Sequence, residues 1–242
     1  MMDKTDSFSS ITAVILAGGL GARLRSVVTD RPKVLVAVQG KPFITYILDQ
    51  LAKAGIKDVI LCTGYLGEQV KATLGSTYGS LRLVYSQEKE LLGTGGAVRL
   101  ALPLIKTDPL LVMNGDSYCE ADLQAFYRQH QTAQADASLL LAPLADTQRY
   151  GRVEVEESGC ILRFKEKGQS TSAGWINAGI YLLSRRFLQA IPADKAISLE
   201  KEVFPAWIGR GLYGFPSSGS GGRFLDIGIP EDYAIAEEFF HP

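Results

Sequence analysis

The sequence predicts an α/β fold, a three-layer sandwich with a mostly parallel, mixed central sheet and a small antiparallel extension. Two observations predict it. In the first half of the chain, short runs of β-branched and aliphatic residues alternate with amphipathic stretches, as in successive βαβ units. In the second half, strand-like segments follow one another directly, which is typical of antiparallel pairing. The arrangement is Rossmann-like, and we treat residues 1–242 as one domain with halves at about 11–135 and 136–242.

The first half supplies the parallel part of the predicted sheet. Its apolar runs predict strands over residues 11–19, 57–65, 81–86 and 109–116. Amphipathic spacing predicts helices over 42–55, 67–75 and 95–105. Pro42 suits the first turn of the first helix, and Gly55 suits its C-cap. The continuous apolar run from Leu110 to Met113 fits a strand that is buried on both faces.

The second half begins after a helix predicted over 122–134, which Asp122 can cap. Strand-like segments follow over 137–144, 151–158, 159–167 and 175–184, with a hairpin turn at Ser158-Gly159. Two more helices are predicted over 198–209 and 231–240. Residues 216–222, "PSSGSGG", have the composition of a mobile loop.

Composition excludes several classes of function. The formal net charge is −1 with lysines and arginines spread along the chain, so nucleic acid and anionic lipid are not expected as partners. No apolar stretch reaches the ~20 residues of a membrane span, and "MMDKTDSFSS" lacks a signal-peptide core. We therefore expect a cytoplasmic protein with small-molecule ligands. Three scattered cysteines and two histidines offer no zinc motif, although Cys119 lies near the motif "MNGD".

The stretch "ILAGGLGARLRSVVTDRPK" (15–33) places three glycines, at 18, 19 and 21, directly after the first predicted strand. It lacks both the third glycine of a dinucleotide fingerprint and the Gly-Lys-Ser/Thr of a Walker A loop. A plain tight turn would also explain the glycines. Arg23 and Lys33 favour a phosphate site, because glycine N–H groups can approach an anion that cationic side chains then neutralise. The stretch thus predicts a cradle for a polyphosphate.

With these residues the chain resembles the sugar-nucleotide pyrophosphorylases, or nucleotidyltransferases, whose opening motif reads approximately GGxGTRLxPLTxxxPKP. Gly18–Leu24, Thr29 and Pro32-Lys33 match that motif. Further motifs follow in the order of the family through almost the whole chain. They are "LGTGGA" (92–97), "MNGD" (113–116), "YGRVEV" (150–155), "FKEK" (164–167), "INAGIYLL" (176–183) and "FLDIGIPEDY" (224–233).

The resemblance implies that the first half binds a nucleoside triphosphate. Arg23 would grip the β- and γ-phosphates, and Lys33 would neutralise the region of the α-phosphate. The implied cofactor is Mg²⁺, held by Asp116 and Asp226, which complete the implied catalytic set. Gln87 would read the edge of the base. The whole implied nucleotide-binding set is Leu16, Ala17, Gly18, Gly19, Gly21, Arg23, Gln87, Gly93, Thr94 and Gly95.

The resemblance also implies that the second half binds a sugar 1-phosphate. Lys167 would attract the phosphate, while Glu166 and Asn177 would bond to sugar hydroxyls. The implied sugar-side set is Asn114, Tyr150, Gly151, Glu166, Lys167 and Asn177. Taken singly, such residues also have structural explanations as turn formers, satisfied polar groups or surface charges. Their arrival in one order favours a common site.

The implied reaction is the attack of a phosphate oxygen of a sugar 1-phosphate on the α-phosphorus of a nucleoside triphosphate, with pyrophosphate leaving. "RLRSVV" (23–28) resembles the corresponding segment of the guanylyltransferases that act on D-glycero-α-D-manno-heptose 1-phosphate. The expected substrates are therefore GTP and this heptose phosphate, and the expected product is GDP-heptose.

Several alternatives remain open at this stage. Ala22, Val34 and Ile229 depart from the usual family residues, which leaves open a mannose 1-phosphate guanylyltransferase, or a uridylyl- or thymidylyltransferase. A glycosyltransferase would normally carry an Asp-x-Asp motif, which "NGD" lacks. A catalytically silent nucleotide-sugar sensor or regulatory subunit would have lost one of the charged residues, all of which are present. Assembly into a homo-oligomer also remains open.

Overall fold

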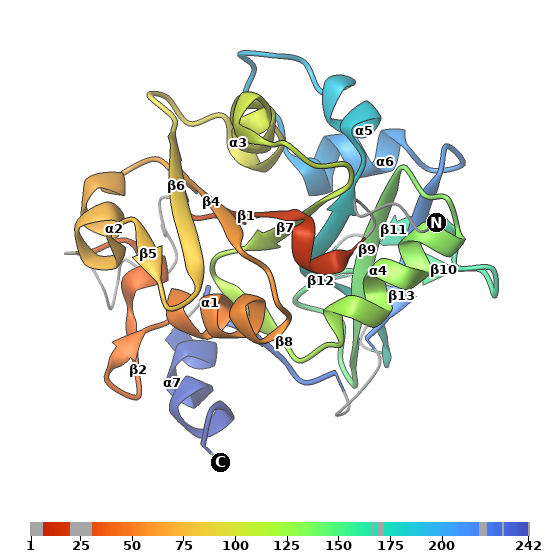
Figure 1. Ribbon diagram of the computed structural model, residues 1–242. Coiled ribbons are helices and arrows are strands. Elements are labelled where there is room, and N and C mark those ends of the chain that lie inside the picture. Colours follow the sequence, from red (N-terminus) through yellow and green to blue (C-terminus); the bar gives the residue numbers. More distant parts are fainter. Residues whose placement is uncertain are drawn as a thin grey trace.

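A mixed sheet of ten strands crosses the computed structural model, which describes residues 7–19, 31–165, 167–168, 172–217, 222–228 and 230–241 (Figure 1). Its first part is parallel. β1 (Thr12–Leu16) lies between β4 (Asp58–Thr63) and β7 (Leu110–Asn114), and β6 (Leu81–Gln87) pairs with β4. The short strand β5 (Thr77–Tyr78) closes this edge in antiparallel orientation. The four parallel strands predicted for the first half are confirmed.

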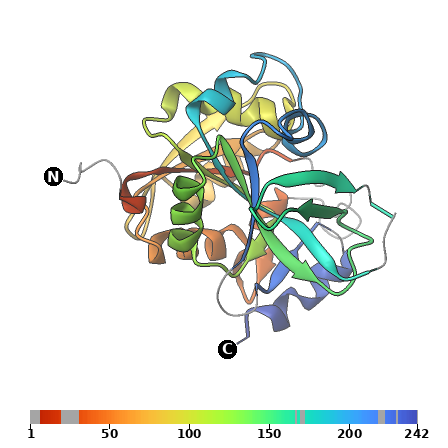
Figure 2. The same cartoon turned by 90° about the vertical axis from the view of Figure 1, so that its right-hand side faces the viewer.

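The second part of the sheet is antiparallel apart from one strand pair. The long strand β12 (Gly174–Leu183) pairs with β7 and so joins the two parts into one sheet. It also pairs with β9 (Ala137–Leu144) and β10 (Arg152–Val155), and β10 forms a hairpin with β11 (Ile161–Lys165). Figure 2 shows these strands, green to teal, from the side. The predicted antiparallel extension is confirmed.

One strand of this part was not predicted. β13 (Leu212–Pro216) pairs in parallel with β9, with Gly214 opposite Leu139. It is short, has a glycine at its centre, and ends in the proline with which the predicted loop begins, so its composition favoured a turn. Residues 218–221 of that predicted loop lie outside the described residues.

Helices cover both faces of the sheet and give the predicted three layers. β1 shows this directly, because Ala13 and Ile15 belong to one apolar core and Val14 belongs to the other. The first core is completed by α1 (Ile44–Lys53), α2 (Gly67–Leu74), α4 (Leu123–Thr132) and α7 (Pro230–Phe239). The second is completed by α3 (Gly93–Ala101), α5 (Arg185–Gln189) and α6 (Phe204–Ala206). The predicted α/β sandwich is confirmed.

The helix predicted over 198–209 is not one continuous α-helix. A π-helical turn, η4 (Leu199–Val203), precedes α6, and the side chain of Ser198 accepts a hydrogen bond from the backbone N–H of Lys201. Pro205 removes a backbone N–H in the middle of the segment, which interrupts regular α-helical bonding. The remaining short elements are the 3₁₀ turns η1 (Phe8–Ser10), η2 (Lys33–Leu35) and η3 (Leu102–Leu104), and the ribbon of β2 (Ala37–Val38) and β3 (Lys41–Pro42).

A separate two-stranded ribbon lies beside the sheet. It pairs β8 (Ser117–Cys119) with β14 (Phe224–Asp226), so residues more than a hundred positions apart in sequence become neighbours. Across the described residues, no helix is both long enough and apolar enough to cross a bilayer.

Candidate active site

A pocket of about 450 Å³ opens where the carboxyl ends of β1 and β7 meet. This is the edge at which open parallel sheets bind their ligands. The pocket walls come from both halves of the chain. The lining residues are Leu16, Ala17, Gly18, Gly19, Lys33, Val34, Glu88, Leu91, Gly93, Thr94, Ala97, Asn114, Asp116 and Gly228.

The turn after β1 forms one wall of the pocket. The backbone N–H of Ala17 donates to the carbonyl of Cys62, which extends the β1–β4 pairing by one bond. Gly18 lies in a close approach, because a Cβ there would lie 2.6 Å from Glu88 Oε1 and 3.2 Å from the backbone nitrogen of Gly64. The structure therefore places Leu16 to Gly19 against the pocket. Gly21 and Arg23 lie outside the described residues.

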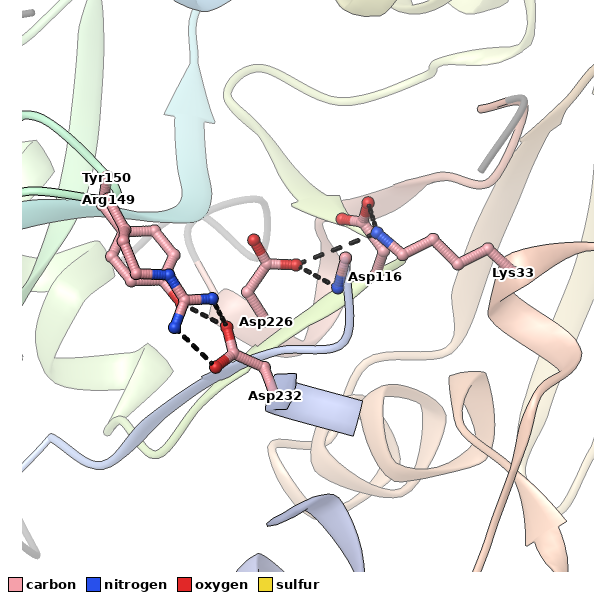
Figure 3. Close-up of polar contacts among 7 residues, drawn as sticks. Lys33, Asp116, Arg149, Tyr150, Asp226 and Asp232 are labelled. Carbon is pink, nitrogen blue, oxygen red and sulfur yellow. Dashed lines mark hydrogen bonds and ion pairs between the residues drawn. The ribbon is translucent and has the colours of Figure 1, made fainter. Parts of the chain in front are cut away.

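Three charged side chains meet at one side of the pocket (Figure 3). Lys33 Nζ lies 2.6 Å from Asp116 Oδ2 and 3.8 Å from Asp226 Oδ1. The lysine side chain is only 10% exposed, whereas those of Asp116 and Asp226 are 42% and 22% exposed. An ammonium group thus lies between two carboxylates that remain open to a ligand.

Local structure brings these three residues together. Pro32 precedes the 3₁₀ turn η2, in which Lys33 is the first residue. Asp116 follows β7 directly, and Gly115 before it donates its N–H to the carbonyl of Leu16 at 2.9 Å. Asp226 ends β14 opposite Ser117 of β8, which places it beside Asp116.

The tight turn after β14 fixes the second aspartate. The backbone N–H of Gly228 donates to Asp226 Oδ1 at 2.6 Å, and that of Ile227 donates to the carbonyl of Asp116 at 3.0 Å. A Cβ at residue 228 would lie 2.9 Å from Lys33 Nζ and 2.6 Å from Asp226 Oδ1, so a larger residue here would displace the charged ends of both side chains.

The donor set at this cluster fits a hard divalent cation. One positive charge, the Lys33 ammonium, already lies between the carboxylates of Asp116 and Asp226. Two carboxylates suit Mg²⁺, which commonly takes one or two protein carboxylates and completes its coordination with water and substrate phosphates. Within the described part of the chain, no group of three or more histidines, cysteines and acidic residues could hold a metal by itself.

Of the neighbouring residues Gln87 and Glu88, the structure brings only the carboxylate to the lining of this pocket. Gln87 is exposed and lies outside the pocket lining, whereas its neighbour Glu88 lines it. Glu88 Oε2 accepts the backbone N–H of Leu92 at 3.0 Å. Burial raises the pKa of Glu88, and this hydrogen bond lowers it by less. The glutamate is therefore an acceptor held in a partly desolvated position.

The motif "LGTGGA" (92–97), called the second glycine turn below, lies at the start of α3 and packs closely against Ile197. Gly93 has φ +68°, and a Cβ there would lie 2.7 Å from the carbonyl oxygen of Ile197. The N–H of Gly95 donates to the same oxygen at 2.9 Å, so Gly95 serves packing and does not line the pocket. Gly93 and Thr94 do line it.

The residues expected on the sugar side are spread over a wider area. Asn114 lines the pocket, and its Oδ1 is buried without a hydrogen bond to the described residues. Asn177 makes two internal hydrogen bonds, with Tyr181 and the N–H of Gly179. Lys167 is exposed and lies outside the lining, and Glu166 lies outside the described residues.

Tyr150 and Gly151 belong to a loop tied to α7 (Figure 3). The Tyr150 hydroxyl donates to Asp232 Oδ2 at 2.8 Å, and the Arg149 guanidinium binds both oxygens of the same carboxylate at 3.1 and 2.8 Å. Burial and the neighbouring Asp232 carboxylate raise the pKa of Tyr150, so its hydroxyl stays protonated. The Gly151 N–H donates to the carbonyl of Thr147 at 3.0 Å within the loop.

Two residues near the site, Glu88 and Asp232, emerge only from the structure. The sequence holds one signal for Glu88. In an extended chain neighbouring side chains point in opposite directions, so at most one of Gln87 and Glu88 could face the pocket.

Cys119 is fully buried in the core under α1, and burial raises the pKa of its thiol to about 12. It is therefore a packing residue.

Comparison with known proteins gives a consistent set of relatives. The family model described as Nucleotidyl transferase matches residues 12–241. The D-glycero-alpha-D-manno-heptose 1-phosphate guanylyltransferase of Aneurinibacillus thermoaerophilus is 38% identical over 227 residues, covering 93% of this chain and 96% of that protein. The mannose-1-phosphate guanylyltransferase of Mycobacterium tuberculosis is 35% identical over 228 residues, covering 92% of this chain and 62% of that protein.

A solved structure matches over nearly the same extent. The crystal structure of HddC from Yersinia pseudotuberculosis complexed with GMP-PN has a TM-score of 0.83 and 33% identity, covering 96% of this chain and 100% of that chain. Sequence and structure thus point to the same group of proteins.

Proposed function

The chain belongs to the nucleotidyl transferase family, and on this premise we propose that it transfers GMP from GTP to a sugar 1-phosphate and releases pyrophosphate. The observation that carries the proposal is the cluster of Lys33, Asp116 and Asp226 at the glycine-lined pocket. Two anionic substrates must meet here, and the cluster offers both a buried ammonium and carboxylates able to hold a cation.

The described residues would act by binding and alignment, without a covalent intermediate. The N–H groups of the turn after β1 donate toward phosphate oxygens, and Lys33 neutralises charge on the phosphoryl group that is transferred. Arg23, expected from the sequence to grip the outer phosphates, completes the proposal. A Mg²⁺ ion held by Asp116 and Asp226 would polarise phosphate oxygens as a Lewis acid.

Glu88 supports guanine as the base. An ionised carboxylate only accepts hydrogen bonds, and guanine presents two adjacent donors, N1–H and the N2 amino group, on its Watson–Crick edge. Uracil and thymine present a single donor flanked by two carbonyl oxygens, which a carboxylate repels. We therefore assign base recognition to Glu88 in place of Gln87, in agreement with the guanylyltransferases among the relatives.

D-glycero-α-D-manno-heptose 1-phosphate is the proposed acceptor, and mannose 1-phosphate is the second candidate. Both share the manno configuration of the ring, and the heptose carries one more hydroxylated carbon beyond it. The relative named for the heptose has 38% identity and matches over 96% of its length, which favours the heptose over mannose, whose named relative matches over 62%. The reaction is proposed to occur in the cytoplasm, where GTP is available.

The test is a matrix of nucleoside triphosphates and sugar 1-phosphates with Mg²⁺, read as pyrophosphate release. We expect the highest kcat/KM for GTP with the heptose phosphate. A preference for UTP or dTTP would contradict the guanylyl assignment, while a preference for mannose 1-phosphate would retain it and change the sugar. Absence of release with every pair would favour a silent sensor. Association of copies stays a prediction.

A further inference from the structure

The carboxylate of Glu200 joins the nucleotide side of the pocket to the sugar side. Glu200 lies in η4 and is partly buried. It accepts hydrogen bonds from three hydroxyl groups: Thr94 at 2.7 Å, Ser198 at 3.0 Å and Tyr181 at 3.1 Å. Thr94 comes from the second glycine turn and Tyr181 from β12, so one side chain connects elements of both halves.

The first branch from Glu200 holds the second glycine turn. Thr94 lines the pocket, and its hydroxyl donates to Glu200 while accepting the backbone N–H of Leu199 at 2.8 Å. The N–H of Gly95 donates to the carbonyl of Ile197, and that of Ile197 donates to the carbonyl of Leu92. The position of this pocket wall is therefore set by the segment that carries Glu200.

The second branch reaches the sugar side through Tyr181, which is fully buried. A tyrosine hydroxyl has one hydrogen and two lone pairs. Its hydrogen goes to Glu200, because a carboxylate can only accept, and it accepts Asn177 Nδ2 at 3.0 Å. The side chain of Asn114 acts on this hydroxyl as a donor and lowers its pKa, by less than burial raises it. Burial raises the pKa of Tyr181 well above its ordinary value, so the hydroxyl remains a donor.

The donor role of Asn114 toward Tyr181 favours one orientation of its amide. With its nitrogen directed to Tyr181, Asn114 leaves Oδ1 buried and without a hydrogen bond to the described residues. A buried acceptor without a donor costs free energy, and Asn114 lines the pocket. A hydroxyl group of a bound substrate is the donor that would satisfy it. Asn177 is fixed in the same way, because its Oδ1 accepts the N–H of Gly179 at 2.9 Å.

We propose that Glu200 is a positioning residue that holds Thr94 and, through Tyr181, the amide of Asn114 in register, so that the nucleotide and the sugar phosphate are aligned with each other. The inference rests on the proposed function and deepens it. Glu200 does not line the pocket, so its effect on both substrates passes through the residues it holds.

Two variants separate the branches. Glu200→Gln keeps the shape but replaces the acceptor of three hydroxyls, and we expect KM for GTP and KM for the sugar phosphate each to rise about tenfold, the effect of losing roughly one hydrogen bond to a charged group. Tyr181→Phe removes only the second branch. It should raise KM for the sugar phosphate by about fivefold and leave KM for GTP within about twofold.

Glu202→Gln is the matched control. Glu202 is exposed in the same turn, and its Oε1 accepts the N–H of Ser198, a bond that glutamine can retain. Both Michaelis constants should stay within about twofold of wild type. GTP binding by calorimetry and the melting temperature Tm are measured for every variant, so that binding is followed independently of turnover.

The outcomes distinguish the proposed function from the proposed role of Glu200. An inactive wild type would contradict the proposed function, and calorimetry would still show whether Glu200→Gln weakens GTP binding about tenfold, as expected. An active wild type with unchanged Michaelis constants and unchanged GTP affinity in Glu200→Gln would contradict the role of Glu200, even if Tm falls. If Glu200→Gln does not fold, an unchanged KM for the sugar phosphate in Tyr181→Phe overturns the proposal.

Discussion

Lys33 Nζ lies 2.6 Å from Asp116 Oδ2, although the two residues are 83 positions apart in sequence. The contact places a nearly buried ammonium beside a half-exposed carboxylate at the pocket. The lysine therefore serves two needs. It offsets the repulsion between the two aspartates, and in the proposed reaction it presents a positive charge to a bound phosphate.

Lys33→Ala should lower kcat by roughly 10² to 10³, the scale of losing one preorganised group that stabilises transition-state charge. Pyrophosphate release at saturating GTP and sugar phosphate measures it. Lys41→Ala is the control, because Lys41 also pairs with an aspartate, Asp49 at 3.3 Å, but is exposed and outside the pocket. Activity of Lys33→Ala within about threefold of wild type would remove the lysine from the mechanism.

Asp226→Asn should raise the Mg²⁺ concentration needed for half-maximal activity and lower kcat by roughly 10² or more, because it removes one of two anionic ligands. Chelation of divalent ions should abolish the activity of the wild type, and added Mg²⁺ should restore it. Asp49→Asn provides the control for an exposed ion-paired aspartate. An unchanged Mg²⁺ dependence in Asp226→Asn would assign this carboxylate a structural role only.

Glu88→Gln should reduce the preference for GTP over UTP by roughly 10- to 100-fold, the discrimination expected from one paired set of hydrogen bonds to a base edge. The variant should also be more stable at neutral pH. Because burial raises the pKa of Glu88, its ionised form destabilises the folded state above that pKa, and the neutral amide removes this effect.

The pH dependence gives an independent check on Glu88. Guanine binding needs the ionised carboxylate, so KM for GTP should rise as the pH falls through the raised pKa of Glu88. The variant with glutamine should lack this rise. Equal pH profiles for KM in the two proteins would show that Glu88 does not contact the base.

Asp232→Asn should raise KM for the sugar phosphate by roughly fivefold and leave KM for GTP unchanged, because it weakens the anchoring of Tyr150 and Arg149 to α7. Glu231→Gln is the matched control, an exposed acidic residue in the same helical turn. If both variants have the Michaelis constants of wild type, the loop that carries Tyr150 does not contribute to sugar binding.

His130 predicts an acid-sensitive step in stability. It is buried, with Nδ1 2.7 Å from Ser138 Oγ, and burial lowers its pKa to about 4 from 6.5. The unfolded chain then binds more protons between these values, so the free energy of unfolding should fall by about 3 kcal/mol as the pH drops from 6.5 to 4. Denaturant titrations at several pH values should show a smaller fall in His130→Gln, and equal slopes would contradict the assignment.

Local patterns in the sequence were sufficient for most of the fold. The apolar run of β7 predicts a strand buried on both faces, and the glycines after β1 predict a turn at its carboxyl end. β13 was missed because its pairing with β9 depends on a partner about 75 residues away, which no local pattern encodes.

The candidate site could be located from the sequence in part, because Lys33 follows the glycine stretch and Asp116 comes from the family resemblance, and the structure brings both to the pocket. It was not predictable where one position of register decides which side chain enters the pocket. Glu88 in place of Gln87 is such a case. Gly95 is a different case, because it lies outside the pocket lining and its N–H donates to the carbonyl of Ile197, so its place in the nucleotide-binding set stays a prediction.

The pairing of β14 with β8 has a consequence for synthesis of the protein. The parallel strands, the first glycine turn, Lys33 and Asp116 all emerge from the ribosome well before Asp226. A growing chain can thus complete one wall of the site while still lacking the second acidic side chain. The carboxylate of Asp226 can join Lys33 and Asp116 only after β14 has been synthesised and has paired with β8.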